Sequence, residues 1–135
     1  MNGALVRKKQ KLQTLQRIRG VELFELKKAL NKQNQAMAEA QRHYIEQSEL
    51  MLQLEQTDSS YIYKSPQLHS SFSRELDKQY KAVESAKQKL NANQTQVDTT
   101  TKKLVLAYGK SELAEQKASE VTAELHDIYT QQEIN

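Results

Sequence analysis

The chain has little of what builds thick cores, sheets and tight turns. It contains no cysteine or tryptophan, one proline, three glycines and two phenylalanines among 135 residues. Such a composition cannot fill a thick globular core, and it offers few turn residues for hairpins or a second domain. The absence of cysteine excludes disulfides and fits a reducing compartment. We expect one all-helical unit with a single interruption.

Long apolar runs are missing as well. The longest clear run covers residues 104–108, whereas a membrane-spanning helix needs about 18 apolar residues. The basic N-terminal stretch lacks the apolar centre of a signal peptide, so we expect a cytoplasmic protein that does not insert into a membrane. The formal net charge of +3 argues against nucleic acid as the main partner, because proteins that follow a phosphate backbone carry many more basic residues.

No pattern of catalytic or metal-binding residues is present. The three histidines lie far apart in the sequence, and there is no glycine-rich phosphate loop or nucleophile elbow. A rod of two helices has no interior to enclose a substrate. We expect neither an enzyme nor a cofactor.

What the chain does have is an uninterrupted seven-residue repeat in its second half. Thirteen of its seventeen positions are apolar, and such a repeat makes a helix supercoil around a long partner. The repeat comprises Phe72, Leu76, Gln79, Val83, Ala86, Leu90, Asn93, Val97, Thr100, Leu104, Ala107, Ser111, Ala114, Ala118, Val121, Leu125 and Ile128.

The first half supplies that partner. Eight of its ten heptad positions are apolar: Leu23, Leu26, Leu30, Gln33, Met37, Ala40, Tyr44, Gln47, Met51 and Leu54. The only proline follows Ser65, a pair typical of an N-cap and a first helical position. We therefore predict an antiparallel coiled-coil hairpin, monomeric and self-contained, with helices over about 4–56 and 66–132 and a loop over about 57–65.

Amides within the two repeats predict the register. Gln33 and Gln47 lie fourteen residues apart, as do Gln79 and Asn93. A register in which facing residue numbers sum to about 126 places Gln47 opposite Gln79 and Gln33 opposite Asn93. Each amide then faces another amide, whereas a slip by one heptad exposes all four to hydrocarbon.

The repeat becomes irregular toward the N-terminus. Lys9, Gln16 and Arg19 occupy the heptad positions there, and we expect the apolar stripe to move to Leu12, Leu15, Ile18 and Val21. Gly20 and Gly109 fall at nearly the same height in this register. Glycine weakens a helix, so the two backbones approach closely there, the coil bends, or a weak point is tolerated.

Two surface features are candidates for function. Near the termini, a basic stretch of helix 1 lies opposite an acidic stretch of helix 2, which predicts either internal charge pairing or a charged surface for a partner. Around the loop, Tyr61, Ile62, Tyr63, Leu68 and Phe72 form either a local apolar plug or a docking surface.

These features resemble the stalk proteins of type III secretion and flagellar export, the FliJ/YscO (SctO) group. The resemblance covers essentially the whole chain. It rests on the size of the chain, on the basic start from Arg7 to Arg19 leading into Glu22 and Leu26, and on the heptad-bearing second helix that begins near Phe72.

The resemblance implies a rod that links a hexameric export ATPase to the cytoplasmic domain of the export gate protein, peripheral to the inner membrane. The ATPase-binding residues would be Arg7, Lys8, Lys11, Arg17, Arg19, Glu112 and Glu120. The gate-binding residues would be Phe72, Leu76, Tyr80 and Val83, together with the apolar loop residues. Two alternatives are an escort that binds secretion chaperones or late substrates, and a plain structural spacer.

Overall fold

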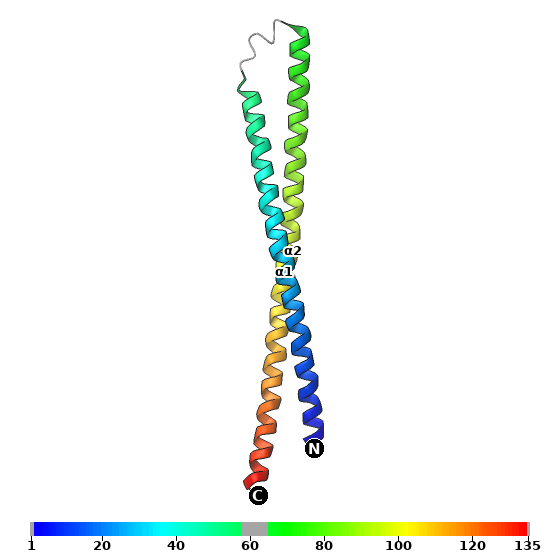
Figure 1. The fold of residues 1–135 in the computed structure, drawn as a ribbon, viewed down its shortest axis with the longest axis vertical. Helices are drawn as coiled ribbons and strands as arrows, with labels where there is room; N and C mark the ends of the chain where they lie inside the picture. Colours follow the sequence, from blue (N-terminus) through cyan, green and yellow to red (C-terminus); the bar gives the residue numbers. More distant parts are fainter. Residues whose placement is uncertain (1, 58–64, 135) are drawn as a thin grey trace. The chain divides into compact units, whose positions relative to one another are not determined.

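The computed structural model describes residues 2–57 and 65–134, which form two long helices. Helix α1 runs from Asn2 to Glu55 and α2 from Pro66 to Ile134 (Figure 1). No strand occurs in these two ranges. The predicted all-helical class is confirmed, and the observed helix bounds lie within two residues of the predicted ones. The predicted loop residues Tyr61, Ile62 and Tyr63 lie outside the described residues.

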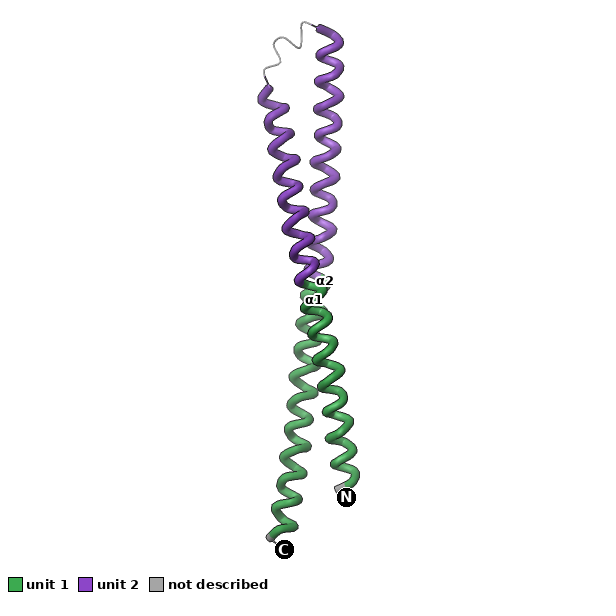
Figure 2. Tube along the Cα trace, viewed as in Figure 1, with its two compact units in different colours: residues 1–30, 99–135 green, residues 31–98 purple. Residues whose placement is uncertain are grey.

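The chain divides into two compact units (Figure 2). Unit 1 combines Met1–Leu30 with Thr99–Asn135, and unit 2 comprises Asn31–Asp98. Within each unit, a segment of α1 packs against a segment of α2 that runs in the opposite direction. Each unit therefore has one seam between two helices and no third layer.

The start of α2 follows from its first residues. The backbone N–H of Leu68 donates to Oγ of Ser65 at 3.5 Å, and the N–H of His69 donates to the carbonyl of Ser65 at 3.0 Å. Pro66 takes the first helical position, where no N–H is needed. The predicted cap is confirmed, and it fixes where α2 begins.

The seam follows the heptads as predicted. All seventeen positions of the repeat in α2 are buried or half-buried, and over residues 66–133 only Ala82 joins them. All ten predicted positions of α1 from Leu23 to Leu54 are also buried or half-buried. The most deeply buried side chains are small, including Ala86, Ala107 and Ala114 at 2–4% exposure. Alanine allows helices to approach closely, so the core is a narrow stripe.

The predicted shift of the stripe near the N-terminus is wrong for two of its four residues. Leu12 and Leu15 are half-buried, but Ile18 and Val21 are 56% and 63% exposed. The seam instead continues along the unchanged heptad through Lys9, Gln16 and Arg19, which are half-buried. Helix geometry determines which positions face the partner helix, and long polar side chains can cover the seam with their aliphatic stems.

One predicted amide pair sets the register of unit 2. Nε2 of Gln79 donates to the side-chain Oε1 of Gln47 at 3.0 Å and to its backbone carbonyl at 2.8 Å. These residue numbers sum to 126, as predicted. A buried amide is costly unless it is hydrogen-bonded, so this pair favours the observed alignment.

The two units share this register. In unit 2 the hydroxyl of Tyr80 contacts Glu55, and in unit 1 Nζ of Lys27 lies 5.0 Å from the ring centroid of Tyr108. Tyr108 follows Tyr80 by 28 residues, and Lys27 precedes Glu55 by 28 residues. Both intervals equal four heptads, so the two contacts join equivalent heptad positions, one pair within each unit.

The second predicted amide pair is not hydrogen-bonded. Oε1 of Gln33 is buried and has no hydrogen-bond partner among the described residues. Asn93 is one methylene shorter than glutamine, and it lines a hollow beside Ala40 and Ala86. The shorter amide leaves the carbonyl of Gln33 unsatisfied.

Replacing Gln33 and replacing Gln79 should therefore change the free energy of unfolding in opposite directions. Gln33→Leu removes a buried, unpaired carbonyl and should raise the free energy of unfolding by about 1 kcal/mol. Gln79→Leu leaves Oε1 of Gln47 without its donor and should lower it by about 1–2 kcal/mol. Urea unfolding followed by circular dichroism measures both changes, and changes of the same sign would contradict this account.

The glycines are not sites of close approach. A Cβ built on Gly20 or Gly109 meets nothing within 4 Å, so the predicted alternative of closely approaching backbones is wrong. Both residues are exposed within continuous helices. Each glycine therefore costs helix stability without a packing benefit.

Gly20→Ala and Gly109→Ala should each stabilise the protein by about 1 kcal/mol, because alanine restricts the unfolded chain and meets no obstacle in the folded one. Thermal unfolding measures the effect. A matched change at Ala40, Ala40→Gly, should destabilise by a similar amount or more, since that position is buried. A destabilising Gly20→Ala would contradict the open geometry.

Candidate functional site

Unit 1 exposes basic side chains of α1 that form no described ion pair with α2. Arg7, Lys8, Lys11 and Arg17 are exposed on α1. Within the described ranges, the ion pairs are Arg19–Glu22 and Lys81–Asp77, each within a single helix. No described ion pair therefore links the basic stretch to α2, although Lys8 lines a hollow together with Glu120 and Glu124 of α2. These charges remain available to a partner.

Arg19 differs from the other predicted ATPase-binding residues. Its Nη1 donates to Oε2 of Glu22 at 2.9 Å, and its side chain is only 27% exposed. Its Nε is buried without a hydrogen-bond partner among the described residues. Arg19 occupies a heptad position in the seam, so its guanidinium is engaged inside the unit and is not part of the open basic surface.

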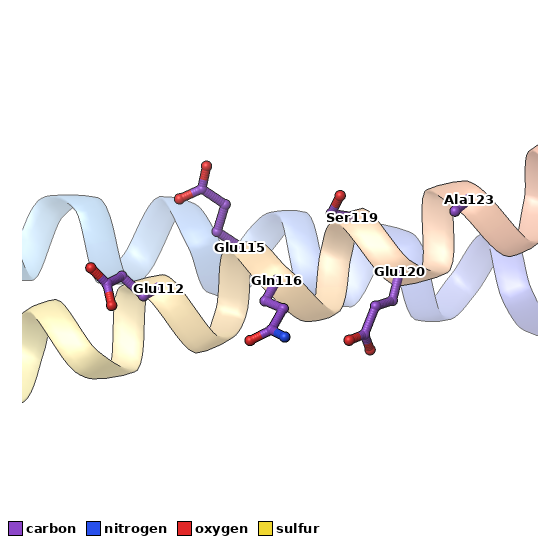
Figure 3. A pocket seen from close by; sticks show the side chains of 6 residues that line it. All are labelled: Glu112, Glu115, Gln116, Ser119, Glu120 and Ala123. Carbon is purple, nitrogen blue, oxygen red and sulfur yellow. The ribbon is translucent and has the colours of Figure 1, made fainter.

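Acidic side chains lie on α2 of the same unit. Glu112, Glu115 and Glu120 line an open hollow with Gln116, Ser119 and Ala123 (Figure 3). Glu115 and Glu120 project to opposite sides of α2 (Figure 3). None of the three carboxylates joins a described ion pair. Within unit 1, α1 therefore carries mainly basic side chains, whereas α2 carries these glutamates together with exposed lysines such as Lys110 and Lys117.

Exposed apolar side chains on both helices of unit 1 were missed by the sequence analysis. On α1 these are Ile18, Val21 and Phe24, and on α2 they are Val105, Leu106 and Leu113, all 52–66% exposed. All six lie between the heptad positions, on the sides that face away from the other helix. In the observed register Val21 and Val105 lie at the same height. Extending the heptad phase toward the N-terminus would have identified this outer face of α1.

Unit 2 separates the predicted gate-binding residues into two groups. Phe72, Leu76 and Val83 are half-buried in the seam, whereas Leu68 and Tyr80 are 49% and 57% exposed. Seam residues are occupied by contacts with α1. A partner of unit 2 would therefore meet Leu68 and Tyr80 first.

Tyr80 is held at the surface by a contact between the helices. Its hydroxyl donates to Oε1 of Glu55 at 3.0 Å. The hydrogen bond to Glu55, the negative charge of that carboxylate and desolvation all raise the pKa of Tyr80 above its ordinary value of 10.0. The contact therefore favours the neutral phenol and orients its ring.

The pKa of Tyr80 should fall toward its ordinary value in Glu55→Gln, because that change removes the negative charge beside the phenol. Tyrosinate absorbance, compared between each protein and its Tyr80→Phe counterpart, isolates this titration. Because the pKa of Tyr80 is raised in the folded state, the Tyr80–Glu55 contact stabilises the fold at pH values below the unfolded-state pKa of Tyr80. This contribution to stability is lost as the pH rises through the folded-state pKa. Identical titrations with and without the carboxylate would contradict the contact.

Over 2–57 and 65–134, no group of three or more His, Cys, Asp or Glu side chains is arranged to hold a metal ion. Neither α1 nor α2, as far as they are described, combines the length and apolar content of a membrane span. Comparisons of the chain with protein-family models, with curated proteins and with solved structures gave no match.

Proposed function

We propose that this protein is the central stalk of a type III secretion export apparatus, located in the cytoplasm at the inner membrane. Unit 1 binds the hexameric export ATPase, and unit 2 contacts the cytoplasmic domain of the export gate protein. The stalk promotes assembly or turnover of the ATPase and thereby protein secretion. The proposal extends the family resemblance of the sequence to the surfaces of the two units.

The observation that carries the proposal is the set of unpaired basic side chains in unit 1. Arg7, Lys8 and Lys11 are exposed and form no ion pair with other described residues. A basic surface of this kind favours association with an acidic partner surface and increases the rate of encounter. These residues belong to the unit that also contains both ends of the chain.

The apolar outer faces of unit 1 are also consistent with a partner that surrounds it. Val21 on α1 and Val105 on α2 lie at one height on opposite sides of the seam, and they are 63% and 66% exposed. Because α1 and α2 pack only against each other, neither helix covers these exposed valines on the outer faces. Subunits of a ring would meet an apolar face on either side, which is a surface that a partner can bury.

The difference in charge between α1 and α2 of unit 1 gives the stalk a means to influence the ATPase. Within unit 1, α1 presents mainly basic residues, whereas α2 presents Glu112 and Glu120, and Lys8 and Glu120 line one hollow. A ring of identical subunits would therefore meet different charges around the stalk. Coupling requires such differential contact with the states of a partner, so this asymmetry can favour one arrangement of ATPase subunits over another.

The proposal is tested with the purified export ATPase of the same secretion system. The triple variant Arg7→Glu, Lys8→Glu, Lys11→Glu should bind the ATPase roughly tenfold more weakly or worse and should lose most of its stimulation of ATP hydrolysis, because it reverses the charge of the contact surface. Binding is measured by biolayer interferometry and stimulation by phosphate release.

A matched control carries the same charge change in unit 2. Lys32→Glu, Lys78→Glu, Lys87→Glu alters three exposed lysines and should bind and stimulate like the wild-type chain. Circular dichroism confirms that both triple variants remain helical. Equal behaviour of the two variants, or no ATPase binding by the wild-type chain, would overturn the proposal.

A further inference from the structure

The outer face of α1 in unit 1 has a symmetric pattern of residues. Ile18 and Phe24 lie three residues on either side of Val21, and Arg17 and Glu25 lie four residues on either side. All five side chains are exposed. Offsets of three and four residues place them together on one side of a helix. The face therefore has an apolar centre with a positive charge at one end and a negative charge at the other.

We propose that this face binds a second copy of the chain, with the two α1 helices antiparallel and a two-fold axis passing beside Val21. Under that symmetry, a residue a given number of positions before Val21 faces the residue the same number of positions after it in the other copy. Ile18 then faces Phe24 twice, and Val21 faces itself. This inference is independent of the proposed role as an export stalk.

Charge complementarity determines the direction of the two helices. In the antiparallel arrangement Arg17 of each copy faces Glu25 of the other, which gives two ion pairs at the edges of the apolar contact. In a parallel arrangement Arg17 would face Arg17 and Glu25 would face Glu25. Neither residue forms a described ion pair within its own chain. The antiparallel arrangement alone pairs all four charges.

The outer face of α2 has less of this self-complementarity. Its apolar residues surround Gly109, with Leu106 three positions before it and Glu112 three positions after it. An antiparallel pairing centred on Gly109 would match Val105 with Leu113, but it would place each Leu106 against the carboxylate of Glu112, which is unfavourable for both groups. The outer face of α2 is therefore less self-complementary than the outer face of α1.

The contact is small, since it involves one stretch of one helix from each copy. Stable interfaces bury about 1,200–2,000 Å² in total, and a single crossing of two helices buries less. We expect a reversible dimer with a dissociation constant on the order of 100 µM. Each copy remains folded without its partner, because the seam between α1 and α2 lies within one chain.

Sedimentation velocity and equilibrium experiments on the purified chain, from about 10 µM to 1 mM, test the proposal. The wild-type chain should shift from monomer to dimer with concentration. Val21→Glu should remain monomeric, because it places two carboxylates together at the axis. Leu106→Glu is the matched control: it adds the same charge on the outer face of α2, at a similar exposure of 66%, and should dimerise like the wild type.

A charge exchange tests the direction of the helices. Arg17→Glu or Glu25→Arg alone should weaken dimerisation about tenfold, and the two together should restore it, because the ion pairs re-form with opposite polarity. Circular dichroism verifies that each variant remains helical. A monomer at 1 mM, oligomers larger than a dimer, equal effects of Val21→Glu and Leu106→Glu, or no restoration in the double variant would overturn the proposal.

Discussion

The single seam between two helices is the constraint on which the rest of the structure depends. A helix that packs against only one partner helix covers one stripe of its surface, and all its other positions face outward. Here that stripe follows the heptads from Phe72 to Ile128 without interruption. Apolar residues at the outward positions are therefore exposed, and polar residues at heptad positions are partly buried. The exposed Val21 and the half-buried Lys9 are both direct consequences.

Polar residues within the seam have different energetic consequences because their side chains differ in reach. Gln79 spans the seam and donates to two oxygens of Gln47, so its burial favours one alignment. Gln33 is buried beside a shorter amide, and its carbonyl is unpaired. Lys9 is half-buried, and a lysine at such a position can keep its charge in water while its stem covers the seam. The seam is therefore specified by a few amides and stabilised mainly by small and aliphatic side chains.

Periodicity made much of this structure predictable. The seam, both helix ranges, the cap at Ser65 and the Gln47–Gln79 pair follow from spacing and from the hydrogen-bonding capacity of each residue. The expectations for Ile18 and Val21 were wrong because they followed hydrophobicity, whereas the heptad phase determines which side of the helix faces inward. The missing Gln33–Asn93 bond and the Arg19–Glu22 pair depend on side-chain lengths and rotamers, which residue spacing does not define.

The outer faces of unit 1 connect the two proposals through shared residues. Arg17 belongs to the basic surface proposed for the ATPase and also to the self-complementary face centred on Val21. It cannot pair with Glu25 of a second copy and contact an ATPase subunit at the same time. Because the two binding events compete for Arg17, each one lowers the affinity of the other by the same factor. Self-association would therefore lower the affinity for the ATPase, and ATPase binding would favour the monomer, with the fold of each chain unchanged.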